Sequence, residues 1–238
     1  NHKVARKIKN PIVDIAAENG LRTPVVDVLL DPMGPGISRL VFDIKEGGKV
    51  HIYKVKFRGN KVFKDAKLRD AMEKTRQHWM FSWLTSHDLL VDKNLEEDLE
   101  NLKKAYWRLG YKDVFIGKPT ITVEDFTTAK QKKKNEKRIA EAKSPKYDLR
   151  AVLEIPILEG DKFYEGTFKV EDAKVFQEQA LLGKYAEAKR DNRSLLRKFF
   201  GIKPSLEAPK PGEKVVFDFD AVGEAQKKIK EMYGDAAY

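Results

Sequence analysis

The sequence predicts an α+β fold built from tandem units, each with the element order strand, helix, helix, strand, strand. Two observations support this class: an alternating segment that ends in a glycine turn, and the recurrence of the same text along the chain. Tyr53, Val55 and Phe57 alternate with basic residues, which is the pattern of a strand with one buried face. Gly59 follows, and glycine takes the positive φ that a sharp turn toward a helix requires.

An internal repeat divides the chain into units. The text that closes on Glu46-Gly47 recurs at Glu159-Gly160, which is an offset of 113 residues, and the same offset relates Phe63 to Phe176. A repeat of this length indicates separate structural units rather than one large core. The predicted units are the end of one (1–47), a complete one (48–160) and the start of a further one (161–238).

The second helix of the complete unit has the clearest pattern. Its apolar residues follow a 4-3-4-3 spacing and end before Gly110, which is placed to take the left-handed conformation that terminates a helix. The stripe consists of Leu95, Leu99, Leu102, Tyr106 and Leu109. We therefore expect this face to be core, packed on the sheet. The acidic residues Glu96, Glu97, Asp98 and Glu100 are expected mostly on the opposite, solvated face.

The net charge of +10 is concentrated in one segment. Residues 130–146 hold eight basic and two acidic residues. This segment lies in an insertion at about 126–147, between two strands that a short hairpin could connect. The interpretation we favour is a solvated, partly helical protrusion; the alternative is an electrostatic contact with anionic lipid head groups or an acidic partner.

Several function classes are disfavoured. The chain has no cysteine, which excludes disulfides, thiolate metal sites and cysteine nucleophiles. No apolar run approaches the roughly 18 residues of a membrane-spanning helix. The order strand, helix, helix, strand also occurs in KH-type RNA-binding modules, but residues 60–109 contain no glycine and so lack their Gly-x-x-Gly loop.

No catalytic, cofactor or metal site is predicted. Ser86, His87 and Asp88 are adjacent in sequence, so their side chains point in different directions and cannot form a catalytic relay. The four histidines show no spacing that places two ligands on one helix face. His51 is expected to be a packed or half-exposed strand residue.

Trp79, Phe81 and Trp83 form an aromatic group between the predicted helices. Their spacing of two residues does not produce a single helical face. Packing in the core or between units is the favoured interpretation, and a partner-binding patch is the alternative.

The repeated motifs resemble the POTRA domains of the Omp85 family. The resemblance is carried by Phe57-Arg58-Gly59-Asn60, by the helix end Tyr106-Trp107-Arg108-Leu109-Gly110-Tyr111, and by Glu159-Gly160. It covers essentially the whole chain and is strongest in the middle unit. It is weaker in the third unit, where Asp172-Ala173 replaces Gly-Asn.

The resemblance implies a three-stranded mixed sheet covered by two helices in each unit, with the units in an elongated arrangement. It also implies a non-enzymatic periplasmic region of an outer-membrane β-barrel protein, which binds unfolded outer-membrane proteins and accessory lipoproteins. Part of this binding would be β-augmentation, the addition of a strand to an exposed sheet edge. The alternative is the POTRA region of another Omp85-type transporter, for protein secretion or translocation.

The same resemblance places the candidate binding edge on the second strand of each unit. In the complete unit this edge is 113–116, with 121–123 as its candidate extension and an interruption expected at Gly117 and Pro119. Pro156 is expected at a strand end or an unpaired position, because proline cannot donate a hydrogen bond. The candidate edge residues are Asp113, Val114, Phe115 and Ile116, together with Val25, Val26, Asp27 and Val28 of the first unit.

Overall fold

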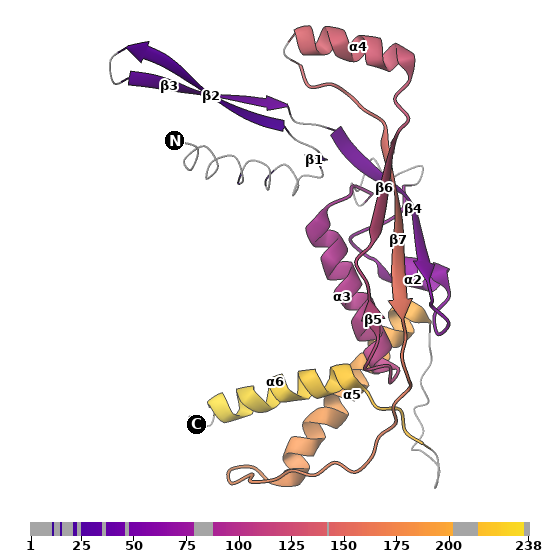
Figure 1. Ribbon diagram of the computed structural model, residues 1–238. Coiled ribbons are helices and arrows are strands. Elements are labelled where there is room, and N and C mark those ends of the chain that lie inside the picture. Colours follow the sequence, from indigo (N-terminus) through magenta and orange to yellow (C-terminus); the bar gives the residue numbers. More distant parts are fainter. Residues whose placement is uncertain are drawn as a thin grey trace. The chain divides into compact units, whose positions relative to one another are not determined.

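A computed structural model describes residues 11, 15, 21–22, 25–34, 37–45, 48–78, 88–141, 143–201 and 214–235 (Figure 1). Among these residues, no helix is both long and apolar enough to span a membrane. The strands are β1 (Leu21–Arg22), β2 (Val25–Gly34), β3 (Ile37–Lys45), β4 (Gly48–Arg58), β5 (Phe115–Ile116), β6 (Thr120–Asp125) and β7 (Leu149–Leu158). The helices are α2 (Asp65–Ala71), α3 (Asp92–Arg108), α4 (Ala129–Ala140), α5 (Glu178–Phe200) and α6 (Phe219–Asp235).

The predicted α+β class is confirmed. One sheet has the strand order β1-β4-β7-β5, with β6 also paired to β7, so β7 is a central strand. β5 and β6 both run antiparallel to β7. β2 and β3 form a separate antiparallel hairpin.

The chain divides into two compact units, and three of the five boundaries between them fall within β4, α3 and β7. The first unit comprises Asn1–Lys56, Glu73–Asp98 and Pro119–Glu154; the second comprises Phe57–Met72, Leu99–Lys118 and Ile155–Tyr238. The repeat boundaries near residues 47 and 160 remain a prediction from the sequence.

β4 departs from the expected alternation at one point. Val50, Ile52, Val55 and Phe57 are buried, whereas Tyr53 is 53% exposed together with its neighbour Lys54. The prediction that Tyr53 lies on the buried face is therefore wrong. The buried positions of β4 therefore change phase by one between Ile52 and Val55.

The predicted core stripe is confirmed at Leu95, Leu102 and Tyr106, which are almost fully buried, whereas Leu99 and Leu109 are only half-buried. Asp98, however, is also fully buried, so its expected solvated position is wrong. Its carboxylate accepts hydrogen bonds from the main-chain N–H groups of Lys74 at 3.1 Å and Thr75 at 2.6 Å. Burial raises the pKa of Asp98, although these hydrogen bonds oppose the shift. The carboxylate thus stabilises the segment that follows α2.

In the second unit, the repeated glycine and glutamate are joined by one set of contacts. Gly59 has φ +91°, and a Cβ there would lie 2.2 Å from the carbonyl oxygen of Ile157. Beside this close approach, Glu159 Oε1 accepts hydrogen bonds from the N–H groups of Lys61 (2.7 Å) and Val62 (2.9 Å) and from the Tyr106 hydroxyl (3.0 Å). One carboxylate oxygen therefore fixes the turn after β4 to the end of β7 and to α3.

The repeat is visible in side-chain geometry, where the phenylalanines are 113 residues apart and their tyrosine partners 127 residues apart. Phe63 meets Tyr106 edge to face with ring centroids 4.9 Å apart, and Phe176 meets Tyr233 in the same way at 5.0 Å. The position equivalent to Gly59 is Asp172, which has φ +57°. It is the one residue other than glycine with positive φ among the described residues. The turn conformation is thus retained without the glycine.

α5 and α6 pack together, and a hollow of about 340 Å³ lies beside them. Its lining includes Leu181, Val222, Ile229 and Tyr233. Leu181 corresponds to the buried Leu68 by the 113-residue offset, and Tyr233 pairs with Phe176 as Tyr106 does with Phe63. The hollow therefore lies on the helix face that matches the core face of the middle repeat.

Candidate functional site

β6 is the open edge of the sheet in the first unit. It pairs antiparallel with β7, from Thr120 opposite Glu154 to Asp125 opposite Leu149. Among the described strands, β7 is the only one that pairs with it. All six side chains of β6 are exposed, including Ile121 and Val123. Along an edge strand, alternate N–H and C=O groups point away from the sheet and remain available for another strand.

The other side of this sheet is covered. β1 pairs with the first two residues of β4, through Lys49 and its neighbour. Next to them, Leu90 N–H donates to Val50 O at 2.9 Å, and Ile52 N–H donates to Asp88 O at 2.7 Å. The N–H of His78 in turn donates to Ile52 O at 2.6 Å. These contacts occupy the β4 edge with other parts of the chain, which leaves β6 as the accessible side.

The predicted edge at 113–116 is shorter in the structure. Only Phe115 and Ile116 form a strand, β5, opposite Leu158 and Ile157. Val114 is buried, and its N–H donates to the Tyr111 carbonyl at 3.3 Å. Asp113 also precedes β5. Of the four residues, Phe115 offers the largest exposed surface, at 61%.

Pro156 explains why the edge is interrupted. It lies in β7 between the residues that pair with β5 and those that pair with β6. Opposite it, Gly117 N–H donates to Pro156 O at 2.9 Å, and a Cβ on Gly117 would lie 2.8 Å from the proline ring. The prediction of an interruption at Gly117 and Pro119 is confirmed, and Pro156 lies outside the residue pairs that β7 forms with β5 and β6, as expected of a residue with no N–H to donate.

The candidate residues of the first repeat lie at the start of β2. Val25, Val26, Asp27 and Val28 are paired with β3, from Val25 opposite Lys45 to Val28 opposite Phe42. Farther along this hairpin, large apolar side chains are exposed at Leu29, Met33, Ile37 and Leu40. The aromatic residues Trp79, Phe81 and Trp83, as well as Ser86 and His87, lie outside the described residues.

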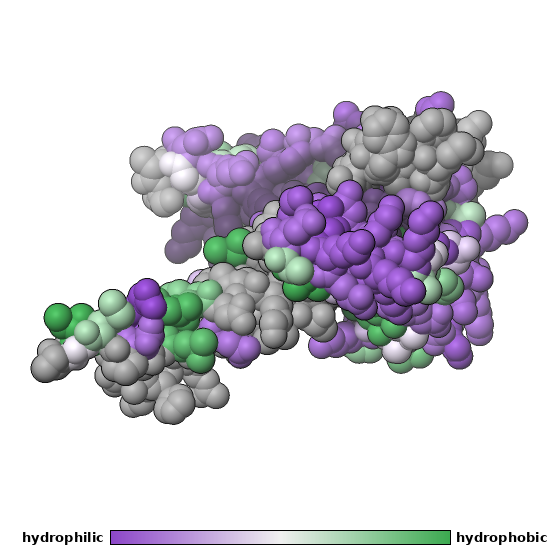
Figure 2. All heavy atoms as spheres, turned by 90° about the horizontal axis from the view of Figure 1, so that it is seen from above, coloured by the Kyte–Doolittle hydropathy of each residue, from purple (hydrophilic) through white to green (hydrophobic). Residues whose placement is uncertain are grey.

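The lysine-rich insertion contains an ordered helix, α4. The Thr128 hydroxyl accepts a hydrogen bond from Gln131 N–H and so caps its first turn. Asn135 is buried, and its side chain both donates to Lys146 O (2.7 Å) and accepts from Lys146 N–H (2.9 Å). The helix carries six basic residues and one acidic residue, and its side of the molecule is strongly hydrophilic (Figure 2).

The end of β6 is tied to this helix. Lys132 forms an ion pair with Asp125 at 3.0 Å, and Thr127 N–H also donates to Asp125 at 2.8 Å. Hydrogen bonds from Thr127 and Lys132 lower the pKa of Asp125 to about 2. The carboxylate therefore remains charged at neutral pH and fixes the junction between β6 and α4.

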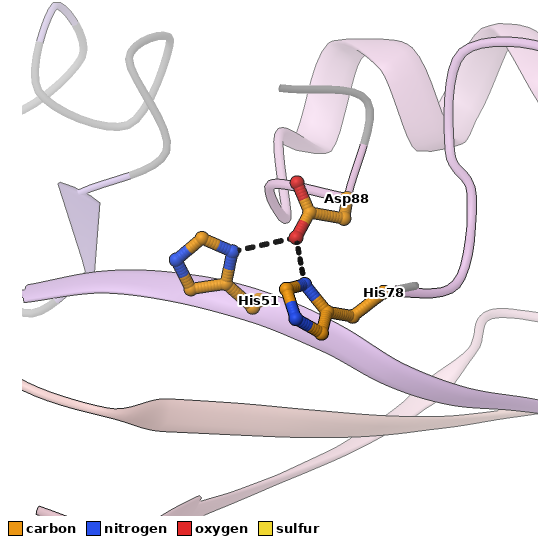
Figure 3. Close-up of side chains that lie close together, drawn as sticks. All are labelled: His51, His78 and Asp88. Carbon is orange, nitrogen blue, oxygen red and sulfur yellow. Dashed lines mark hydrogen bonds and ion pairs between the residues drawn. The ribbon is translucent and has the colours of Figure 1, made fainter. Parts of the chain in front are cut away.

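Two histidines converge on one carboxylate near the covered edge (Figure 3). His51 Nδ1 lies 2.8 Å from Asp88 Oδ2, and His78 Nδ1 lies 2.5 Å from the same oxygen. Burial by itself raises the pKa of Asp88, but hydrogen bonds from His78 and His51 outweigh it and lower the pKa. His51 is half-exposed, as expected. Its proximity to the other two residues was not predicted, because they are distant in sequence.

The middle of the chain is similar in sequence to known proteins. The profile of the POTRA family, described as surface antigen variable number repeat, matches residues 50–140. These residues are similar to a POTRA domain. The outer membrane protein assembly factor BamA of Nitratidesulfovibrio vulgaris is 30% identical over 92 residues, which is 39% of this chain and 12% of that protein. The resemblance to POTRA domains of the Omp85 family, with BamA as a relative, is therefore confirmed.

Two solved structures are also similar to the chain. The crystal structure of Haemophilus influenzae BamA POTRA3-5 is 12% identical, with a TM-score of 0.44, and the match covers 95% of this chain and 68% of that one. The structure of Haemophilus ducreyi BamA lacking POTRA domains 1-3 is 15% identical, with a TM-score of 0.33, over 65% of this chain and 23% of that one.

Proposed function

We propose that this chain is a periplasmic POTRA region of an outer-membrane β-barrel assembly factor of the BamA type. Its role would be binding rather than catalysis. Its partners would be unfolded outer-membrane proteins and accessory lipoproteins of the assembly complex. The family match at residues 50–140 supports the type of domain. The observation that carries the binding role is the open β6 edge.

β6 has the properties that strand addition requires. It is six residues long, it pairs with the sheet on one side, and its N-terminal part carries no charged side chain. Ile121 and Val123 are exposed and β-branched, which favours an extended backbone and offers apolar contacts to an incoming strand. The acidic end of the strand is Glu124 and Asp125.

Recognition through the backbone suits clients of many sequences. Main-chain N–H and C=O groups pair with any extended segment, and the alternating side chains add only moderate selectivity. Strands destined for an outer-membrane barrel alternate apolar and polar residues over roughly ten positions. Such a segment could present its apolar face to Ile121 and Val123 while it pairs with the outer backbone groups of β6.

Proline substitution along β6 tests this proposal. Successive residues of an edge strand direct their N–H groups alternately toward the sheet and away from it. Of Thr122→Pro and Val123→Pro, one therefore removes a group that pairs with β7, and the other removes an outward group. Circular dichroism and thermal unfolding identify which variant keeps the sheet.

Binding is then measured for the variant that keeps its fold, with fluorescent peptides copied from strands of an outer-membrane barrel. We expect a loss of at least about tenfold in affinity, because one backbone donor is lost and the edge is distorted. Lys54→Ala, on the covered strand β4, is the matched control and should bind as the parent does. Unchanged peptide affinity in a folded β6 proline variant would contradict edge capture.

A further inference from the structure

We propose that His51, His78 and Asp88 form a binding site for a divalent transition-metal ion of the zinc class. One nitrogen from each histidine and one carboxylate oxygen all lie within 4.8 Å of one another. The three residues come from β4, from the segment after α2 and from the segment before α3. The site is separate from the β6 edge, so this proposal does not depend on the proposed binding function.

The ligand atoms converge from a fixed framework. The Asp88 side chain is only 3% exposed, and both histidine Nδ1 atoms point at its Oδ2 atom (Figure 3). The two imidazole rings are nearly perpendicular, at 71°, with centroids 5.6 Å apart. Two rings in this arrangement direct their nitrogens to one point without stacking on each other.

The main chain holds the ligands in place. Ile52, which follows His51 in β4, uses its N–H to bind the Asp88 carbonyl and its carbonyl to bind the His78 N–H. The bridge between His51 and Leu89 adds to this pairing. A single strand residue therefore anchors all three ligand-bearing segments, which lowers the ordering cost when an ion binds.

The donor set selects the class of ion. Two imidazoles and one carboxylate are the ligands that zinc, copper and nickel take, whereas calcium and magnesium prefer oxygen ligands alone. Bonds of about 2.0–2.2 Å in a tetrahedron place ligand atoms roughly 3.3 Å apart. The Nδ1 to Oδ2 distances of 2.8 and 2.5 Å need to widen by less than about 1 Å, through side-chain rotation.

The remaining coordination position faces accessible space. The His51 and His78 side chains are 37% and 48% exposed, so an ion can reach the site from solvent and water can complete its coordination. The bound ion would cross-link the segments at residues 78 and 88 to β4. The covered edge of the sheet would then be locked against opening, while β6 stays available.

In the decisive experiment, tag-free protein is first treated with a chelator to remove metal ions. Zn²⁺ is then titrated into the protein, and calorimetry measures its binding. We expect one ion per chain, a higher unfolding temperature with zinc, and slower amide exchange at Ile52 and His78. Co²⁺ should give the visible absorption of a tetrahedral nitrogen and oxygen site. Ca²⁺ and Mg²⁺ should not compete.

Variants locate the site. His51→Ala and His78→Ala change half-exposed side chains and should weaken zinc binding by more than about 100-fold, beyond the effect of losing an outer-shell partner. Asp88→Asn, which keeps the shape of the buried side chain, should also weaken binding. Arg76→Ala, at an exposed residue of the same segment as His78, is the matched control and should bind as the parent does.

Circular dichroism confirms that each variant is folded before its affinity is compared. The proposal would be overturned if the parent protein does not bind zinc. It would also be overturned if both histidine variants bind zinc as tightly as the parent does. Loss of binding in Arg76→Ala alone would also overturn it.

Discussion

Replacing Glu159 by alanine should destabilise the second unit by about 2–4 kcal/mol. The buried Tyr106 hydroxyl loses its charged acceptor, and a buried donor without a partner costs about 1–3 kcal/mol. The part-buried N–H of Val62 loses a further bond, worth about 0.5–1.5 kcal/mol. The N–H of Lys61 is exposed, so water replaces the carboxylate there at little cost.

Urea unfolding of the full chain measures this loss, and amide hydrogen exchange at Val62 locates it. Tyr106→Phe removes the donor together with its need for a partner, so it should cost about 1–2 kcal/mol. In the double variant the two losses should not add, because both remove the same hydrogen bond. Glu136→Ala, an exposed glutamate of α4, is the control and should change stability by less than about 0.5 kcal/mol.

A loss below about 0.5 kcal/mol in Glu159→Ala, or unchanged exchange at Val62, would refute the reasoning. Additive effects in the double variant would show that Tyr106 and Glu159 stabilise the fold separately. Either result would remove the carboxylate as the link between the turn, β7 and α3.

Three further outcomes are expected. Gly59→Ala should destabilise the chain by more than about 1–2 kcal/mol in urea unfolding, because a positive φ is strained for alanine and the added Cβ meets a carbonyl oxygen. Asp172→Gly should instead stabilise the chain, by less than about 1 kcal/mol, because glycine adopts a positive φ without strain. Burial raises the pKa of Asp218 to about 6, so its stabilising contribution is present below about pH 4 and is lost as the pH rises through 6. As the pH rises from 4 to 7, the free energy of unfolding of Asp218→Asn should therefore increase relative to that of the parent by up to about 3 kcal/mol. A difference between the two proteins that stays constant across this range would contradict the raised pKa. Deleting residues 130–143 should leave the sheet and peptide binding intact, because shortening a surface insertion changes the free energy of unfolding only slightly. If the deletion instead causes a salt-sensitive loss of binding to anionic liposomes, α4 contacts lipid head groups.

Local patterns in the sequence were sufficient for much of the fold. The stripe of Leu95, Leu102 and Tyr106 marked a buried helix face, and the turn residue Gly59 has the positive φ that was expected. The repeat also reappears as two similar Phe–Tyr ring pairs. Each of these features depends on residues close together in the chain or on a recurrence of the same text, so periodicity can reveal it.

The tertiary structure alone decided which parts of these elements face solvent and which distant residues meet. Asp98 has the sequence context of a solvated helix face, but it is buried because main-chain N–H groups near residue 74 need an acceptor. The candidate edge at 113–116, with its extension to 121–123, is divided into the short β5 and the longer β6, because Pro156 lies in β7 between the residues that pair with each strand. His51, His78 and Asp88 meet only through strand pairing across 37 residues, and no local spacing encodes a contact of that kind.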